Sequence, residues 1–157
     1  MTKHYVHVLS TFPIQYRHRA QPLEISLTAY PLTSLVTLLI CLLMLATGFN
    51  VGRSRGRYGI KAPAVTGHEM FERAYRIQMN TLENAALLLP ALWVNAGFIS
   101  DRGAAGLGAF WLISRIWYAI AYQSDPAKRG PAFGLSMTAF AFTWSAAAWG
   151  IARVLMH

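Results

Sequence analysis

The chain alternates long apolar segments with short polar ones, and this pattern gives the first expectation. Residues 25–52, 84–100 and 130–152 contain no Asp, Glu, Lys or Arg. A helix needs about 20 mainly apolar residues to cross the hydrocarbon core of a bilayer. The pattern therefore predicts membrane-spanning helices, the first from about Leu27 to Phe49 and the last over residues 130–152.

The middle of the chain predicts two further spans that include polar residues. The uncharged run 84–100 is too short to span comfortably alone, so the second helix, from about Phe71 to Phe98, must include RAYRIQMNTLE. Pro90 then lies inside a membrane helix, where a kink is tolerated. After the short connection ISDRG, the third helix ends at Tyr122. The chain is thus predicted to be an all-α membrane protein, a bundle of four transmembrane helices.

The polar segment before the first span predicts a separate N-terminal part. We expect residues 1–25 to form an extension and residues 26–157 to form the four-helix transmembrane domain. The first apolar run is too long, and starts too late, for a signal peptide.

Composition and charge support a membrane protein and argue against a nucleic-acid partner. Hydrophobic residues make up 55% of the chain and charged residues 13%, against about 25% charged in an average soluble domain. The net charge of +8 comes from arginines between apolar runs. The basic segment GRSRGRYGIKAPAVTGHE is predicted to be a cytoplasmic loop. We expect a bacterial inner membrane, although the endoplasmic reticulum is compatible with the same pattern. No metal-ligand pattern is present.

Polar residues gather on one face of each middle helix, since an α-helix turns about 100° per residue. On the second helix, an arc of roughly 80° holds Arg73, Arg76, Asn80 and Glu83. On the third helix, an arc of roughly 60° holds Trp111, Arg115, Tyr118 and Tyr122. Both stripes run toward the cytoplasmic end of the predicted bundle.

The surplus of arginines in these stripes predicts an anionic ligand. The alternative is a purely structural role for these arginines. Arg115 could pair with Glu83, and Arg76 could reach the lipid headgroups. Glu83 alone, however, cannot neutralise three guanidinium groups. A guanidinium binds carboxylates in a bidentate manner, while amide and carboxylate side chains can hold amides and an ammonium group. Glutathione is one of several small molecules that fit this set.

The segment ERAYRIQMNTLEN resembles the second-helix signature of the MAPEG family, the membrane-associated proteins of eicosanoid and glutathione metabolism. That signature has the form ER-x-x-R-x-x-x-N-x-x-E. The following order is similar too: an apolar run, a short turn, GAA, then R-x-x-Y-x-x-x-Y at 115–122 and Arg129. The resemblance covers about residues 27–155. It is greatest to the branch with leukotriene C synthase and microsomal glutathione transferases two and three.

The resemblance implies a homotrimer that binds glutathione between neighbouring subunits, near the cytosolic side. It implies that Arg76, Asn80 and Glu83 hold the carboxylates and the amino group of glutathione. It also implies that Tyr118 and Tyr122 contact the same ligand from the third helix. A departure from the branch follows the glutamate, where this chain has an asparagine in place of the usual tyrosine. We expect weaker or reoriented binding as a result.

The remaining implied roles concern the neighbouring subunit and the reaction. Arg55 and Gln78 would contribute to the site from the adjacent subunit, and Arg129 would lie beside the sulfur and favour the thiolate. The thiolate is the nucleophilic form of a thiol. It would attack a lipophilic electrophile, or reduce a lipid hydroperoxide, that arrives from the membrane lipid. The first and fourth helices should offer this substrate an apolar groove.

Two other functions stay open at this stage. The chain could be a non-enzymatic membrane protein that binds lipid or glutathione, although the retained arginine, asparagine, glutamate and tyrosine set disfavours this. It could also be an isomerase that uses glutathione without consuming it, which the sequence does not separate from a transferase. A small transporter is disfavoured because the chain has no inverted repeat.

Overall fold

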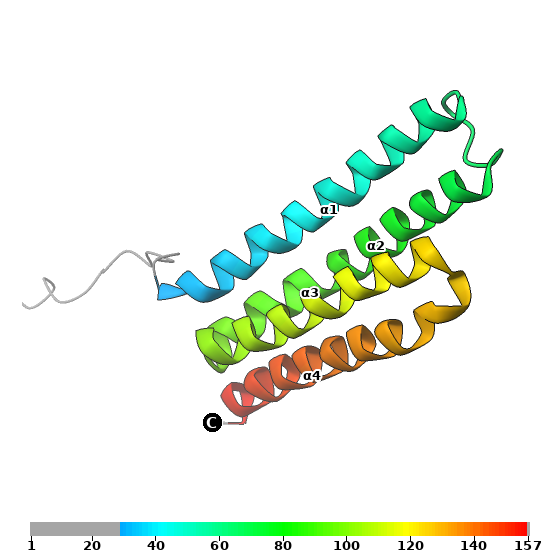
Figure 1. Cartoon of the computed structure of the whole chain (residues 1–157). Helices are drawn as coiled ribbons and strands as arrows, with labels where there is room; N and C mark the ends of the chain where they lie inside the picture. The colour runs from blue at the N-terminus through cyan, green and yellow to red at the C-terminus, as the bar shows by residue number, and fades with distance from the viewer. Residues whose placement is uncertain (1–28, 157) are drawn as a thin grey trace, which may run out of the picture.

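The computed structural model describes residues 29–156, which form a bundle of four helices (Figure 1). The helices are α1 (Pro31–Tyr58), α2 (Glu69–Phe98), α3 (Asp101–Ser124) and α4 (Gly130–Leu155), and a short 3-10 turn, η2 (Pro126–Arg129), precedes α4. The predicted all-α, four-helix class is confirmed. The predicted extension, residues 1–25, and the predicted helix start at Leu27 lie outside the described residues.

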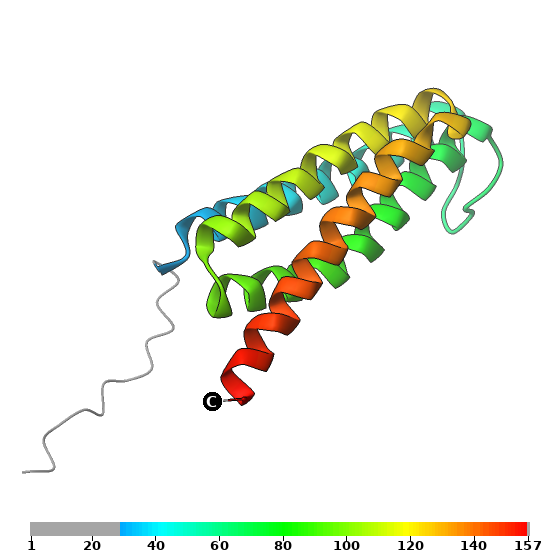
Figure 2. The ribbon, with the colours of Figure 1, turned by 90° about the horizontal axis from the view of Figure 1, so that it is seen from below.

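The two ends of the bundle differ in charge. The α1–α2 loop and η2 lie at one end, and the α2–α3 turn and the C-terminus lie at the other (Figures 1 and 2). We call the first the basic end, because it carries Arg53, Arg55, Arg57, Lys61, Lys128 and Arg129.

The order of packing places α2 and α3 at the centre of the bundle. Each of them packs against the other three helices, whereas α1 and α4 have no substantial contact with each other among residues 29–156. The core contains Ile40, Leu88, Leu92, Trp111 and Ala139, all fully buried. Any groove formed by α1 and α4 together therefore requires more than one copy of the chain.

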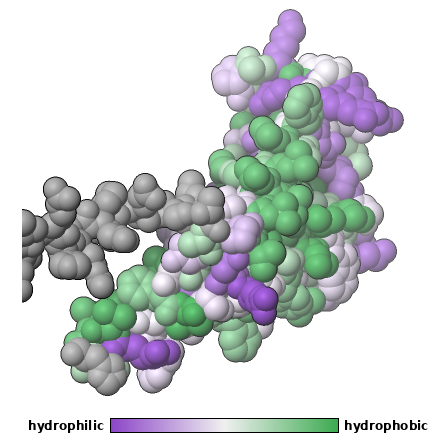
Figure 3. Space-filling model, turned by 90° about the vertical axis from the view of Figure 1, so that its left-hand side faces the viewer, coloured by the Kyte–Doolittle hydropathy of each residue, from purple (hydrophilic) through white to green (hydrophobic). Residues whose placement is uncertain are grey.

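The outer surface of the bundle is largely apolar. Leu38 is 68% exposed, Phe49 80% and Trp144 59%. Hydrophobic side chains cover much of the face in Figure 3, with hydrophilic ones densest near its top and smaller groups of them lower down. By length and composition, α1 and α3 are apolar enough to cross a membrane, whereas α2 and α4 fall short of that measure. An apolar outer surface of this kind suits a lipid environment.

The predicted end of the first helix is wrong. The helix does not stop at Phe49 but continues through GRSRGRY to Tyr58, so the segment predicted as the start of a basic loop is helical. Val51 packs with Phe71 and Ala74 of α2, and this contact outweighs the low helix propensity of the glycines in the segment. The helix ends only at Gly59, whose positive φ of 68° forms the C-cap.

The predicted connection between the second and third helices is also longer than the real one. Only Ile99 and Ser100 separate the two helices, because the Ser100 hydroxyl accepts a hydrogen bond from Gly103 N and starts α3 at Asp101. The Asp101 carboxylate then accepts the backbone N–H groups of Leu32 and Thr33, at 3.1 and 2.8 Å. These N–H groups lie in the first turn of α1 and have no partner within their own helix. Asp101 therefore joins α1 to the α2–α3 turn.

Glycine allows α4 to approach the end of α2 closely. A Cβ atom added at Gly150 would lie 2.6 Å from the Phe98 Cβ, whereas one added at Gly134, on the same helix, would meet nothing within 4 Å. We expect Gly150→Ala to lower the free energy of unfolding by about 1–3 kcal/mol, the usual cost of overpacking. Gly134→Ala should raise it by up to about 1 kcal/mol through helix propensity. Thermal unfolding in detergent measures both, and equal effects would contradict the close contact.

Candidate functional site

A polar cavity of about 330 Å³ lies on α2 near the basic end of the bundle. Three of the residues that line it are the predicted ligand residues of the second helix, Arg76, Asn80 and Glu83. The cavity is completed by Val65 and Thr66 of the α1–α2 loop and by Glu72, Tyr75 and Met79 of α2. The structure thus brings together the α2 part of the predicted site, with the loop as one wall.

The charged groups in this cavity are available to a ligand. The side chains of Arg76 and Glu83 are exposed, and neither forms an ion pair among residues 29–156. Asn80 Nδ2 donates to the backbone carbonyl of Arg76 at 2.9 Å, and Asn84 Nδ2 donates to that of Asn80 at 2.8 Å. A cation, an amide and an anion therefore line one short stretch of α2, a set that suits the carboxylate and ammonium ends of an amino acid.

The predicted ligand residues of the third helix lie outside this cavity. Tyr118 and Tyr122 are only 2% and 8% exposed, and they pack with Ile77 of α2 and Ala132 of α4. The two rings are 5.6 Å apart between centroids. Within one chain, the polar stripe of α2 is exposed while that of α3 is buried, so the two stripes do not line a common cavity.

Arg129 lies where η2 meets α4. Asp125 starts this turn by accepting a hydrogen bond from Ala127 N at 2.9 Å, and the turn brings Arg129 over the ring of Tyr122, with its Cζ 5.1 Å from the ring centroid. The guanidinium is exposed and also donates to Pro126 O. The N-terminus of a helix carries a partial positive charge, so Arg129 and the start of α4 together favour a nearby anion.

The two residues predicted to act from an adjacent subunit occupy other places. Gln78 lines a groove of about 680 Å³ along α1, together with Arg53, Gly48 and Gly52, and so lies on another side of α2 from Arg76. Arg55 donates from Nη1 to Ala64 O at 2.7 Å, and its Cζ lies 4.8 Å from the centre of the Phe71 ring. Arg55 therefore holds the α1–α2 loop in its own chain, and its contact with a neighbouring ligand stays a prediction.

The other arginines of the two stripes contact groups of their own chain, although Arg73 Nε, Arg115 Nε and Arg115 Nη1 have no hydrogen-bond partner within the described residues. Arg73 pairs with Glu69, and its Nη1 donates to the carbonyls of Gln123 and Ser124 at 3.2 and 3.0 Å. Arg115 does not pair with Glu83; it is fully buried and donates to Thr81 Oγ1 at 3.2 Å. Arg76 and Arg129 therefore remain as the candidates to bind the anion that the surplus of arginines predicts.

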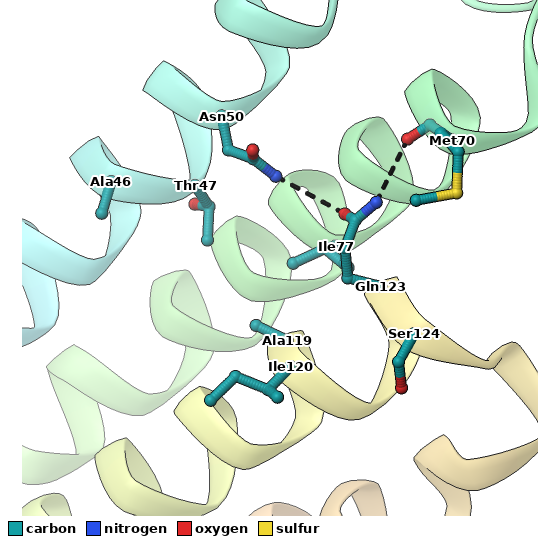
Figure 4. Close-up of a pocket in the computed structure, with 9 residues that line it drawn as sticks. All are labelled: Ala46, Thr47, Asn50, Met70, Ile77, Ala119, Ile120, Gln123 and Ser124. Atoms are coloured by element: carbon teal, nitrogen blue, oxygen red, sulfur yellow. Dashed lines mark hydrogen bonds between the residues drawn. The ribbon is translucent and has the colours of Figure 1, made fainter.

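Sequence reasoning missed part of the polar cavity and a second groove. Glu72 lies one turn before Arg76 and continues the α2 stripe, a signal present in the spacing. The second groove, of about 580 Å³, lies between α1 and α3 (Figure 4). At this groove, Asn50 Nδ2 donates to Gln123 Oε1 at 3.5 Å, and Gln123 Nε2 donates to Met70 O at 3.4 Å. Its remaining lining is mostly apolar, so no sequence motif marks it.

Comparison with known proteins assigns the chain to a family. The profile of the MAPEG family matches residues 33–149, and the chain therefore belongs to the MAPEG family. Membership agrees with the helical bundle, its apolar outer surface and its two long apolar helices. The protein is an all-α membrane protein with a four-helix bundle.

Individual relatives show the same membership. An uncharacterized protein of Synechocystis is 47% identical over 102 residues, which are 65% of this chain and 74% of the relative. Microsomal glutathione S-transferase 2 of Homo sapiens is 33% identical over 104 residues, 66% of this chain and 71% of the relative. Leukotriene C4 synthase of Cavia porcellus is 36% identical over 98 residues, 62% of this chain and 65% of the relative.

The hydrogen bond from Arg55 to Ala64 O predicts how the wall of the polar cavity is held. Arg55→Met should keep the packing against Phe71 but lose this bond, worth about 0.5–1.5 kcal/mol. We expect amide hydrogen exchange in residues 60–66 to become faster by about two- to tenfold. Arg53→Met, which removes an exposed arginine one turn before the end of α1, is the control. Equal exchange in both variants would show that Arg55 does not hold the loop.

Proposed function

We propose that this protein is a membrane-bound glutathione transferase that joins the glutathione thiolate to lipophilic electrophiles. The observation that carries the proposal is the polar cavity in which Arg76 and Glu83 present complementary charges that form no ion pair within the described residues, with the amide of Asn80 between them. Family membership and the similarity to microsomal glutathione S-transferase 2 and leukotriene C4 synthase support it. We name glutathione as the co-substrate, with no metal required.

Glutathione matches the groups in the cavity. Its carboxylates pair with the Arg76 guanidinium in the bidentate geometry that arginine provides. Its ammonium group pairs with Glu83, while Glu72, three turns earlier on α2, accepts a hydrogen bond from Gly67 N and holds the loop wall of the cavity. The side-chain amide of Asn80 hydrogen-bonds to the peptide groups of glutathione. Tyr118 and Tyr122 contact the ligand from α3 once a neighbouring subunit closes the site.

Arg129 is assigned to the sulfur. A fixed guanidinium near a low-dielectric region favours the charged form of a thiol, and the start of α4 acts in the same direction. The thiolate then attacks an electrophilic carbon, a carbon–sulfur bond forms, and the leaving atom departs with its electron pair. A lipid hydroperoxide is a second substrate class, because the same thiolate can attack its terminal oxygen. The O–O bond then breaks, the alkoxide leaves with the electron pair and takes a proton, and a second glutathione reduces the resulting sulfenic acid to give glutathione disulfide and water.

The site is completed by a neighbouring copy of the chain in this proposal. Gln78 lies on a different groove from Arg76, so the two reach one ligand only if Gln78 comes from an adjacent subunit. We propose a homotrimer whose transmembrane domain spans residues 26–157. A groove between α1 of one subunit and α4 of the next then admits the lipophilic substrate. We propose that the basic end faces the cytoplasm, most simply in a bacterial inner membrane.

The division of roles between Arg76 and Arg129 predicts different losses. Wild-type protein mixed with glutathione should show thiolate absorbance in the ultraviolet. Arg129→Ala should lose most of this absorbance yet keep binding within about threefold. Arg76→Ala should weaken binding by at least tenfold, as expected for loss of a charged hydrogen bond of about 1.5–3 kcal/mol. Arg153→Ala, at the opposite end of α4, is the control and should behave as wild type.

Two outcomes of that measurement contradict the proposal. If wild-type protein binds no glutathione, the assignment of the cavity is wrong. If it binds glutathione without forming thiolate, or forms no conjugate with any lipophilic electrophile, the protein is a binding protein and not a transferase. Glutathione that promotes a rearrangement and is recovered unchanged would identify an isomerase.

A substitution at Asn84 should strengthen glutathione binding, whereas the substitutions above weaken it or reduce thiolate formation. The Asn84 side chain is bound to its own helix through Asn80 O, and relatives of the predicted branch have a tyrosine at this place. Asn84→Tyr should add a phenol that hydrogen-bonds to the ligand. The Kd of glutathione should then fall by about two- to tenfold, as expected for one hydrogen bond. Asn84→Phe adds the ring without the hydroxyl and serves as the control. Equal affinity of the two variants would exclude this phenol contact.

A further inference from the structure

Arg115 is the one Asp, Glu, Lys or Arg among residues 29–156 that is fully buried. It lies on α3, inside a bundle with an apolar outer surface. A charge in such a place is costly and normally has a partner or a function. The proposed chemistry does not use it, since the ligand groups are assigned to α2, to the tyrosines and to Arg129.

No carboxylate compensates this charge within the described residues. The ion pairs there are Arg73–Glu69 and Lys128–Asp125, and Arg115 Nε and Nη1 have no hydrogen-bond partner. Aromatic rings take this place: the Arg115 Cζ lies 4.1 Å from the centre of the Tyr118 ring and 5.9 Å from that of Trp111. A guanidinium over a ring face is attracted by the ring, and more strongly when water is excluded.

The contact with Tyr118 is the first of a series that leads to the surface. Tyr118 lies 5.6 Å from Tyr122 between ring centroids, and the Arg129 Cζ lies 5.1 Å from the centre of the Tyr122 ring. Two tyrosines thus stand between two guanidinium groups, one buried and one exposed. We call this series, Arg115–Tyr118–Tyr122–Arg129, the arginine–tyrosine stack.

Arg115 also connects this stack to α2. Its Nη2 donates to Thr81 Oγ1 at 3.2 Å, the only hydrogen bond between α2 and α3 in the described residues in which both side chains are buried. Thr81 follows Asn80, which lines the polar cavity. One side chain therefore contacts both the helix that holds the ligand's charged groups and the stack that ends at Arg129.

We propose that Arg115 is a positioning residue that fixes the arginine–tyrosine stack relative to α2, and so sets where Arg129 meets the sulfur. The inference rests on the proposed function. Without the buried guanidinium, the face of Tyr118 loses its contact and the ring is free to tilt, because its other neighbours are packing contacts only. Tyr122 and Arg129 then lose a fixed support, while Arg76, Asn80 and Glu83 keep their places on α2.

This geometry predicts a separation of kcat from affinity. Arg115→Met keeps the length of the side chain but removes its charge and its donors. We expect the thiolate fraction of bound glutathione and kcat to fall by about tenfold, the effect of losing a desolvated cation–aromatic contact. The Kd of glutathione should rise by no more than about threefold, because the tyrosine contacts weaken while the charged ends of the ligand stay bound to Arg76 and Glu83. Arg115→Lys should recover part of the loss, because it restores a cation over the ring.

Matched variants separate positioning from general damage to the core. Thr81→Val removes the hydrogen bond at nearly constant volume and should lower the thiolate fraction in the same direction as Arg115→Met. Ser114→Ala changes a buried residue of α3 whose hydroxyl donates to Phe110 O of the same helix, and it should leave the thiolate fraction as in wild type. If Arg115→Met does not fold, Arg115→Lys and Thr81→Val test the positioning role of Arg115 in its place. Wild-type thiolate and kcat in both would overturn the inference.

A readout without glutathione keeps this inference separate from the proposed function. Fluorotyrosine can be incorporated and the Tyr118 signal assigned with Tyr118→Phe by fluorine NMR. Loss of the stack should shift and sharpen this signal in Arg115→Met, while Arg129→Ala should leave it almost unchanged. An unchanged signal in Arg115→Met overturns the positioning role even if glutathione binds. Failure of the wild type to bind glutathione, with the signal shifted, defeats only the proposed function.

Discussion

A charged side chain in a membrane bundle must find its compensation inside the protein, and this constraint orders the polar residues of the chain. Arg73 finds it in Glu69 and in the terminal carbonyls of α3, and Arg115 finds it in aromatic faces and Thr81. Arg76 and Glu83 have no such compensation in the described residues. In the proposed function these two unpaired groups bind the ligand, while Arg73 and Arg115 support the helices that present them.

Much of the architecture could be predicted from the sequence, because long apolar runs indicate membrane helices and the helical period of the polar residues before residue 84 extends the second helix. The α2 stripe could also be predicted, since Arg76, Asn80 and Glu83 follow the helical period. The extension of α1 past Phe49 could not, because it depends on contacts of Val51 with α2 that no local pattern reveals. For the same reason, the sequence left open whether Arg115 pairs with Glu83, and the structure shows that it contacts Thr81 and Tyr118 instead. Helical spacing shows that two faces are polar, but not how the helices are rotated against each other.

The candidate site, like the fold, could be predicted from the sequence only in part. Residue types and spacing predicted that Arg76, Asn80 and Glu83 share one face of α2, and they line one cavity, yet the wall formed by Val65 and Thr66 follows from the path of a loop. The burial of Tyr118 and Tyr122 follows from the packing of α3 between α2 and α4. Sequence reasoning thus finds chemistry within one element more readily than contacts that join several.

The length of α1 has a consequence for how the two proposed substrates reach the protein. With 28 residues at about 1.5 Å each, α1 is roughly 42 Å long, whereas the hydrocarbon core is about 30 Å thick. Its last turns, with Arg53, Arg55 and Arg57, therefore extend into the aqueous boundary of the membrane. A water-soluble thiol would arrive there at a rate set by its concentration in solution. A lipophilic partner would arrive by lateral diffusion, at a rate set by its mole fraction in the lipid. The turnover of such a protein would depend on two concentrations measured in different phases.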